Sequence, residues 1–159
     1  MKRIIIVATL MLTFLVFISC HAEKESTEKS ANTAELNWLE NLEEAVDTAE
    51  ANDQPILVNF TGSDWCGWCK RLHSEVFSQT AFIDYAGKNL VLLKLDFPKY
   101  IQQSEETKKY NSDLLTKYGV RGFPTILLLN SKGEELKRTG YQPGGAEAYI
   151  KHLEELLSS

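Results

Sequence analysis

The sequence predicts an α/β domain in which a mixed sheet of about four strands is flanked by helices on both faces. Two apolar runs, 55–60 and 90–96, have the length of strands, and the second is too apolar for a sheet buried on one face only. A third apolar run at 124–129 is followed by a turn at 130–133 and an alternating run at 134–139, a pattern typical of a hairpin. Helical patterns precede, separate and follow these runs, so the expected order is α-β-α-β-α-β-β-α.

The first helix is expected over residues 37–53. Asn37 can act as its cap, because Glu40 follows three residues later. Apolar residues then recur at helical spacing until Asn-Asp at 52–53 ends the pattern. Trp38, in the first turn, is expected to pack in the core.

The remaining helices are expected from their boundaries. One should run from Cys66 to about Phe77, after a loop at 61–64, and a short helical piece is expected at 81–86. Ser104 can cap a further helix that Gly119 ends, because glycine readily adopts the left-handed conformation found after a helix. A last amphipathic helix should follow Pro-Gly-Gly at 143–145.

The N-terminus is typical of a signal peptide. Basic residues precede an uncharged apolar run at 4–18, which is shorter than most membrane spans. A small residue followed by Cys20 is similar to the bacterial lipobox, which predicts a signal peptide at 1–19 and lipidation of Cys20. Cleavage after Ala22, or a retained anchor, is the alternative interpretation.

Residues 20–35 are expected to form a flexible tether, because 21–35 contain no large apolar side chain that could support folding. Residues 36–159 then form one domain with one core. The full chain has a net charge of −5, and removing residues 1–19 takes away only basic side chains, so nucleic acid is excluded as a partner. We expect an exported, membrane-anchored lipoprotein facing the periplasm or the cell exterior.

The domain contains two cysteines, Cys66 and Cys69, directly after the first strand. Two cysteines are too few for a structural disulfide framework or a four-thiolate zinc site. Their spacing predicts a dithiol on the first turn of a helix, where the dipole stabilises a thiolate. A soft-metal site formed with His73 is the alternative, whereas haem attachment would need histidine in place of Lys70.

Three segments together resemble the thioredoxin-like thiol–disulfide oxidoreductases, in particular exported bacterial members with an insertion after the second strand. Residues 60–70 (Phe-Thr-Gly-Ser-Asp-Trp-Cys-Gly-Trp-Cys-Lys) are similar to the active-site loop of that family. Residues 118–125 (Tyr-Gly-Val-Arg-Gly-Phe-Pro-Thr) are similar to its cis-proline segment, and Gly133 and Gly140 match its terminal hairpin. The resemblance implies a thioredoxin fold.

The resemblance also implies a role for each residue of the site. Cys66 would be the attacking, partly exposed thiolate and Cys69 the buried resolving thiol. Pro124 would be cis and would present the backbone of Phe123 to an extended substrate.

Further residues of the motif would contact the substrate or tune the cysteines. Trp65, Gly67 and Trp68 would line the contact surface. Asn59 occupies the position of a buried carboxylate in many thioredoxins, and it has no proton to exchange at neutral pH. The proton of the resolving thiol would then pass to water or to Asp64, with Lys94 tuning the region. Asn59 can equally be a core polar group, and Asp64 a capping residue.

The expected function is exchange of the Cys66–Cys69 pair with disulfides of protein substrates, with the protein acting as a reductase and a membrane partner supplying electrons. The cysteines carry the electrons, so no organic cofactor or metal is needed. The alternatives are a disulfide oxidase or isomerase, or a soft-metal-binding protein that uses Cys66, Cys69 and His73.

Overall fold

The computed structural model describes residues 36–159 of the chain. The expected signal peptide (1–19), the lipidation at Cys20 and the tether (20–35) lie outside these residues. None of the helices between residues 36 and 159 has the length and hydropathy that a membrane span requires.

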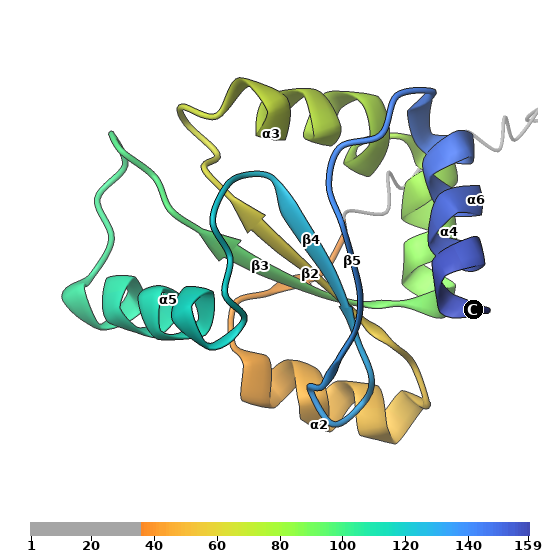
Figure 1. Cartoon of the computed structure of the whole chain (residues 1–159), viewed down its shortest axis with the longest axis horizontal. Coiled ribbons are helices and arrows are strands. Elements are labelled where there is room, and N and C mark those ends of the chain that lie inside the picture. The colour runs from red at the N-terminus through yellow and green to blue at the C-terminus, as the bar shows by residue number, and fades with distance from the viewer. Residues whose placement is uncertain (1–35) are drawn as a thin grey trace, which may run out of the picture. The chain divides into compact units, whose positions relative to one another are not determined.

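The described part of the chain forms one five-stranded sheet covered by helices (Figure 1). Its strands are β1 (Trp38–Leu39), β2 (Ile56–Thr61), β3 (Val91–Asp96), β4 (Thr125–Leu129) and β5 (Glu135–Thr139). Its helices are α2 (Leu42–Asn52), α3 (Gly67–Leu72), the π-helical turn η1 (His73–Phe77), α4 (Thr80–Asn89), α5 (Glu105–Lys117) and α6 (Gly145–Leu157).

The sheet is mixed, and its strand order is β1-β3-β2-β4-β5. Strands β1, β3 and β2 run parallel, whereas β4 is antiparallel to β2 and β5 is antiparallel to β4. The predicted α/β class, the mixed sheet and the terminal hairpin are therefore confirmed. The sheet has one strand more than expected, because β1 was not predicted.

The start of the first helix was predicted four residues too early. Trp38 pairs with Leu92 in the sheet, and the helix begins only after Asn41, whose side chain accepts a 2.8 Å hydrogen bond from the Glu44 N–H. Residues 37–40 and 41–44 both read Asn-x-x-Glu, so the capping pattern alone could not choose between them. A two-residue strand leaves no periodicity to detect, because its pairing is decided by the distant β3.

Alternate residues of the central strands face two separate cores, whereas the sequence predicted a single core. Ile56, Val58 and Phe60 of β2 face a core that also contains residues of α2 and α5, whereas Leu57 faces a core that contains residues of α3, η1, α4 and α6. Figure 1 shows these two groups of helices on opposite sides of the sheet. The even-numbered positions of β2 face the first core, so Asn59 lies on the other face, which α3 covers.

The expected helix from Cys66 to about Phe77 is divided in two. Residues 67–72 are α-helical, and 73–77 form η1, where the wider π-helical turn continues the chain. Trp38 packs edge-to-face on Phe77 with ring centroids 5.3 Å apart, in agreement with the expected packing role of that tryptophan. Helix α4 covers residues 80–89 and is longer than the expected piece at 81–86.

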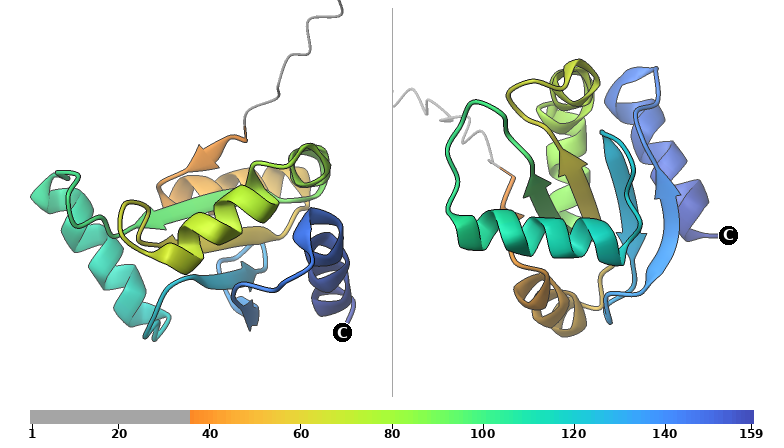
Figure 2. Two further views of the ribbon diagram at one scale, coloured as in Figure 1. Left: turned by 90° about the horizontal axis from the view of Figure 1, so that it is seen from above. Right: turned by 60° about the vertical axis from the view of Figure 1, so that its left-hand side comes forward.

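The loop between β3 and α5, residues 97–104, lies beside the loop that leads from β2 into α3. Both views in Figure 2 show the two loops next to each other at the same end of the sheet. Strands β2 and β3 are parallel neighbours, so their carboxyl ends deliver both loops to this edge.

Candidate active site at the Cys66–Cys69 pair

Cys66 and Cys69 form a disulfide at the N-terminus of α3. Cys66 is the N-cap residue, and the backbone N–H of Cys69 donates a 3.2 Å hydrogen bond to the Cys66 sulfur. In the reduced protein the same donor and the helix dipole would stabilise a thiolate on Cys66. The position of the Cys66 sulfur at the N-terminus of α3 therefore suits a nucleophilic thiolate.

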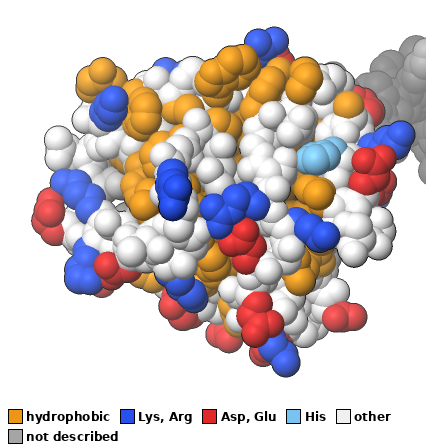
Figure 3. Space-filling model, viewed as in Figure 1, with side chains coloured by type: hydrophobic (Ala, Val, Ile, Leu, Met, Phe, Trp, Pro, Cys, Tyr) orange, Lys and Arg blue, Asp and Glu red, His pale blue; other side chains and the backbone are white. Residues whose placement is uncertain are grey.

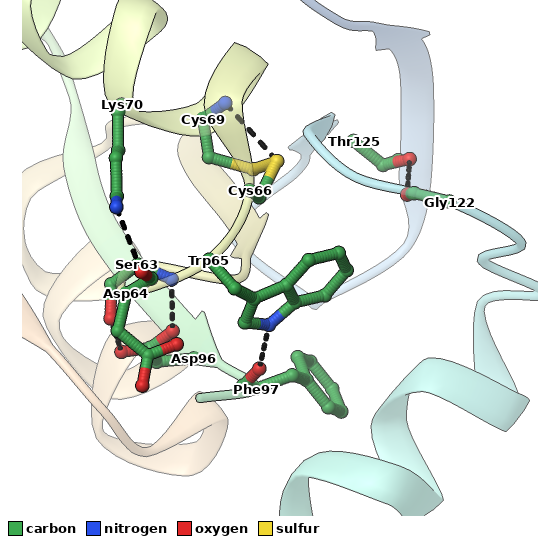
Figure 4. Close-up of a disulfide and its surroundings, with 10 residues drawn as sticks. All are labelled: Ser63, Asp64, Trp65, Cys66, Cys69, Lys70, Asp96, Phe97, Gly122 and Thr125. Atoms are coloured by element: carbon green, nitrogen blue, oxygen red, sulfur yellow. Dashed lines mark hydrogen bonds between the residues drawn. A yellow bond between two sulfur atoms is a disulfide. The ribbon is translucent and has the colours of Figure 1, made fainter. Parts of the chain in front are cut away.

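The two cysteines are almost equally covered in this disulfide form. Cys66 is 6% exposed and Cys69 is 5% exposed, so the expected partial exposure of Cys66 is not seen here. The Cys66 sulfur is covered because it is bonded to the Cys69 sulfur and accepts a hydrogen bond from the Cys69 backbone N–H in the first turn of α3. Figure 4 shows the disulfide above Trp65 and facing the segment that contains Gly122 and Thr125.

The peptide bond between Phe123 and Pro124 is cis, as expected. The Thr125 hydroxyl donates a 2.7 Å hydrogen bond to the Gly122 carbonyl and closes this turn just before β4 (Figure 4). A Cβ at Gly140 would lie 3.3 Å from the Pro124 carbonyl oxygen, so a residue without a side chain lets the end of the hairpin approach this loop.

Trp65 holds the active-site loop in place. Its indole N–H donates a 2.8 Å hydrogen bond to the Phe97 carbonyl (Figure 4), and its ring packs edge-to-face on Phe123 with centroids 6.0 Å apart. A Cβ at Gly62 would lie 2.5 Å from the indole, so this glycine provides the space that the ring occupies. The residue expected to contact substrate thus uses much of its surface inside the protein.

Asp64 is bound to the loop that follows β3. Its carboxylate accepts hydrogen bonds from the N–H groups of Lys99, Tyr100 and Ile101, at 3.0, 2.7 and 3.0 Å. Desolvation would raise the pKa of the Asp64 carboxyl, but these backbone donors outweigh it and hold the pKa below its ordinary value. A carboxylate held in its ionised form is a poor proton acceptor, so the geometry favours the capping role over the catalytic base.

Asp96 is a site residue that sequence reasoning missed. One carboxylate oxygen accepts a 2.9 Å hydrogen bond from the Ser63 backbone N–H, and the other accepts a 2.5 Å hydrogen bond from the Ser63 hydroxyl (Figure 4). The available signal was its position at the carboxyl end of β3, next to the end of β2 in the parallel pair. This contact fixes the start of the loop that leads to Cys66.

Asn59 lies on the α3 face of β2 and is 8% exposed. Its Oδ1 has no hydrogen-bond partner among the described residues. Together with Cys69 and Lys94 it lines a cavity of about 360 Å³, which is large enough to hold water beside the resolving cysteine. Lys94 is paired with Asn59 in the sheet, and its ammonium lies 3.9 Å from a Glu40 carboxylate oxygen. The structure thus brings Asn59, Cys69 and Lys94 together at one cavity.

His73 also lines this cavity but is otherwise exposed. Within residues 36–159 no group of three or more His, Cys, Asp or Glu side chains is arranged to hold a metal ion. The alternative site of Cys66, Cys69 and His73 is therefore not formed in this structure.

Trp68 is 56% exposed and lies beside the disulfide on the solvent side of α3. Its ring centroid is 5.2 Å from that of Tyr141, and the Arg71 guanidinium lies 5.6 Å from the Trp68 centroid. Tyr141 in turn donates a 2.6 Å hydrogen bond to Glu75. A Cβ at Gly67, between the two cysteines, would meet nothing within 4 Å, so the space around this residue is open.

The Glu75 carboxylate holds this aromatic group in place. The Tyr141 hydroxyl first, and then Arg71, lower the pKa of the Glu75 carboxyl, so it stays ionised at neutral pH. Trp68 packs on Tyr141 and Arg71 and remains 56% exposed.

Comparisons with known proteins agree with this geometry. A family model described as a thioredoxin-like domain matches residues 42–157. The disulfide bond reductase DsbH of Chlamydia pneumoniae is 36% identical over 124 residues, which cover 78% of this chain and 74% of that protein. The thioredoxin-related protein DsbJ of the same organism is 26% identical over 88% of this chain, which spans only 38% of DsbJ. A solved structure of a DsbH oxidoreductase superposes with a TM-score of 0.73 and 32% identity, covering 86% of this chain and 96% of that one.

Proposed function

The chain belongs to the thioredoxin-like thiol–disulfide oxidoreductases, and from this premise we propose that it is an exported reductase of disulfides in protein substrates. One observation carries the proposal: Cys66 caps a helix, receives the Cys69 N–H and forms a disulfide with Cys69. Exchange with protein substrates is the reaction that the family implies. The name of the 36% identical relative, a disulfide bond reductase, supports the direction of electron flow.

The reaction needs only the two sulfurs. The Cys66 thiolate attacks one sulfur of a substrate disulfide, a mixed disulfide forms, and the other substrate sulfur leaves as a thiolate that takes up a proton. Cys69 then loses its proton and attacks Cys66, which forms the Cys66–Cys69 disulfide and releases the second substrate thiol. Two electrons pass from the dithiol to the substrate, and a separate membrane donor would have to return them.

Two cysteine variants test this mechanism. Reduction of a protein disulfide should disappear in Cys66→Ser, because the attacking sulfur is absent. Cys69→Ser should accumulate mixed disulfides, since nothing resolves them, and mass spectrometry would show the substrate on Cys66. Activity that survives in both variants would contradict the proposal.

The equilibrium potential of the Cys66–Cys69 pair against glutathione tests the direction. A reductase should lie near thioredoxin, at about −270 mV, whereas a disulfide-forming oxidase such as DsbA lies near −120 mV. A value near the second figure would assign the protein to disulfide formation.

We propose further that the protein is tethered to a membrane through a lipid on Cys20 and faces the periplasm or the cell exterior. Support comes from the sequence, in which an apolar run at 4–18 ends just before a small residue and Cys20. Radiolabelled palmitate should enter the wild-type protein and not Cys20→Ala, and equal labelling of the two would overturn this proposal.

A further inference from the structure

The loop between β3 and α5 is fixed to the active-site loop at three consecutive residues. Asp64, two positions before Cys66, accepts the backbone N–H groups of Lys99, Tyr100 and Ile101. Hydrogen bonds to an ionised acceptor are stronger than neutral ones, so this attachment restrains the loop tip. The tip is therefore held at a set position beside the active-site loop.

Three further contacts attach the same loop to both halves of the site. The Lys99 ammonium lies 4.0 Å from the centroid of the Trp65 ring, and Trp65 donates its indole N–H to the Phe97 carbonyl. The Phe97 ring stacks on Phe123, next to the cis peptide, with centroids 5.0 Å apart. The loop thus contacts the segment that leads to Cys66 and the segment that leads to Pro124.

The restrained tip exposes two large apolar side chains. Tyr100 is 77% exposed and Ile101 is 59% exposed. Four large hydrophobic side chains are exposed within residues 36–159. Trp68 lies between the two cysteines, Tyr100 and Ile101 lie on the loop bonded to Asp64 of the active-site loop, and Leu136 lies elsewhere, in β5. Figure 3 shows hydrophobic side chains, with Lys and Arg among them, along the upper edge of the molecule over α3 and this loop. Apolar exposure concentrated around a reactive group indicates a binding surface.

We propose that Tyr100 and Ile101 form a docking surface for the polypeptide that carries the substrate disulfide, and that this surface selects substrates with an apolar side chain within a few residues of the reacting cysteine. The inference rests on the proposed function. The loop contacts Trp65, the residue before Cys66, and Phe123, the residue before the cis peptide, so a polypeptide whose cysteine reaches Cys66 lies close to this loop. Because Asp64 already holds the loop, binding there costs less ordering of the loop.

Two peptides of the same length test this selection. Each carries one cysteine in a disulfide with glutathione, and they differ only in having Leu or Ser at the positions around that cysteine. The reduced protein converts each peptide disulfide into a peptide thiol and glutathione, and it becomes the Cys66–Cys69 disulfide. The measured quantity is the ratio of the second-order rate constants for the Leu and Ser peptides, with oxidised glutathione as a small reference disulfide.

We expect the wild-type protein to prefer the Leu peptide by about tenfold, the size of effect that burial of a large apolar side chain or two can give. In Tyr100→Ser/Ile101→Ser the ratio should fall close to one. In the matched control Leu136→Ser, at the exposed position away from the site, the ratio should stay at the wild-type value. Asp64→Asn, which weakens the attachment of the loop, should give an intermediate ratio.

A wild-type ratio near one, or a tenfold ratio that persists in the double variant, would overturn the docking surface while leaving the disulfide chemistry intact. Dimerisation that the double variant abolishes, together with an unchanged peptide ratio, would assign the surface to a second copy of the chain instead. Failure of the reduced wild-type protein to react with either peptide or with oxidised glutathione would overturn the proposed function, and this inference with it.

Discussion

The two tryptophans beside the dithiol have opposite roles in the structure. Trp65, just before Cys66, packs over Gly62, contacts Phe123 and donates its indole N–H to the Phe97 carbonyl. Trp68, between the cysteines, is 56% exposed, and its ring packs on Tyr141 and Arg71. One indole builds the active-site loop, and the other is available to a partner.

The comparison shows that two tryptophans equally close in sequence to a cysteine of the pair can differ in packing and in exposure to solvent. The difference follows from the element on which each residue lies. Trp65 lies in the loop between β2 and α3. Its indole N–H donates to the Phe97 carbonyl in the loop after β3, a backbone acceptor that would otherwise need another donor. Trp68 lies on the first turn of α3 and points to solvent.

The largest expected effect is that of Trp65→Ala on stability. Loss of the indole removes a hydrogen bond and the contacts with Phe123, and it leaves space above Gly62. The free energy of unfolding of the oxidised protein should fall by about 2–3 kcal/mol, measured by urea denaturation. A loss below about 0.5 kcal/mol would contradict the structural role.

A smaller effect is expected from protonation of Asp64. Its pKa is lower in the folded protein than in the unfolded chain, so its contribution to stability is present above the ordinary aspartate value of about 3.9 and is lost as pH falls through the lower folded value. The amide proton resonances of Lys99, Tyr100 and Ile101 should therefore shift together with a midpoint below about 3.9.

The Asp64→Asn variant provides the control for this titration. Its side chain does not ionise in this range, so the common shift of the three amide resonances should disappear. A wild-type midpoint at or above the ordinary value would show that the carboxylate is not held by these donors.

The smallest effect on stability is expected from Trp68→Ala, because the ring is exposed. The free energy of unfolding should stay within about 0.5 kcal/mol of the wild-type value. The rate of reaction with a protein disulfide should nevertheless fall by about fivefold, since an exposed aromatic contact of roughly 1 kcal/mol is lost. A loss of stability in Trp68→Ala as large as that expected for Trp65→Ala would show that both tryptophans support the fold, and would contradict the contrast between them.

Most of the fold could be predicted because each long element has its own local signal. The structure has strands at the three predicted apolar runs, β2, β3 and β4. It also has the predicted cap of α5 at Ser104 and the left-handed glycine, Gly119, after that helix. Strand β1 could not be predicted, since only its pairing with β3 makes two residues a strand. The helix start was ambiguous because two capping patterns follow one another in the sequence.

In the candidate site, the cysteine pair and the cis peptide before Pro124 could be predicted from motifs, and both are present. A capping role for Asp64 was one of the two predicted alternatives, but its partners at 99–101 could not be predicted, because they are about 35 residues away in the chain. The sequence also left open whether Asn59 is a satisfied core group. In the structure, the Asn59 Oδ1 has no hydrogen-bond partner among residues 36–159, and Asn59 lines the same cavity as Cys69.

The most direct test of the proposed mechanism is the pH dependence of alkylation of the reduced protein by iodoacetamide, with each cysteine followed separately by mass spectrometry. If the helix N-terminus activates the first sulfur, Cys66 should react first, with a midpoint below the value of about 8.5 for a free thiol, while Cys69 stays largely unmodified. Alkylation of Cys69 at the same rate or faster, or a Cys66 midpoint at or above about 8.5, would contradict the assignment of Cys66 as the attacking thiolate.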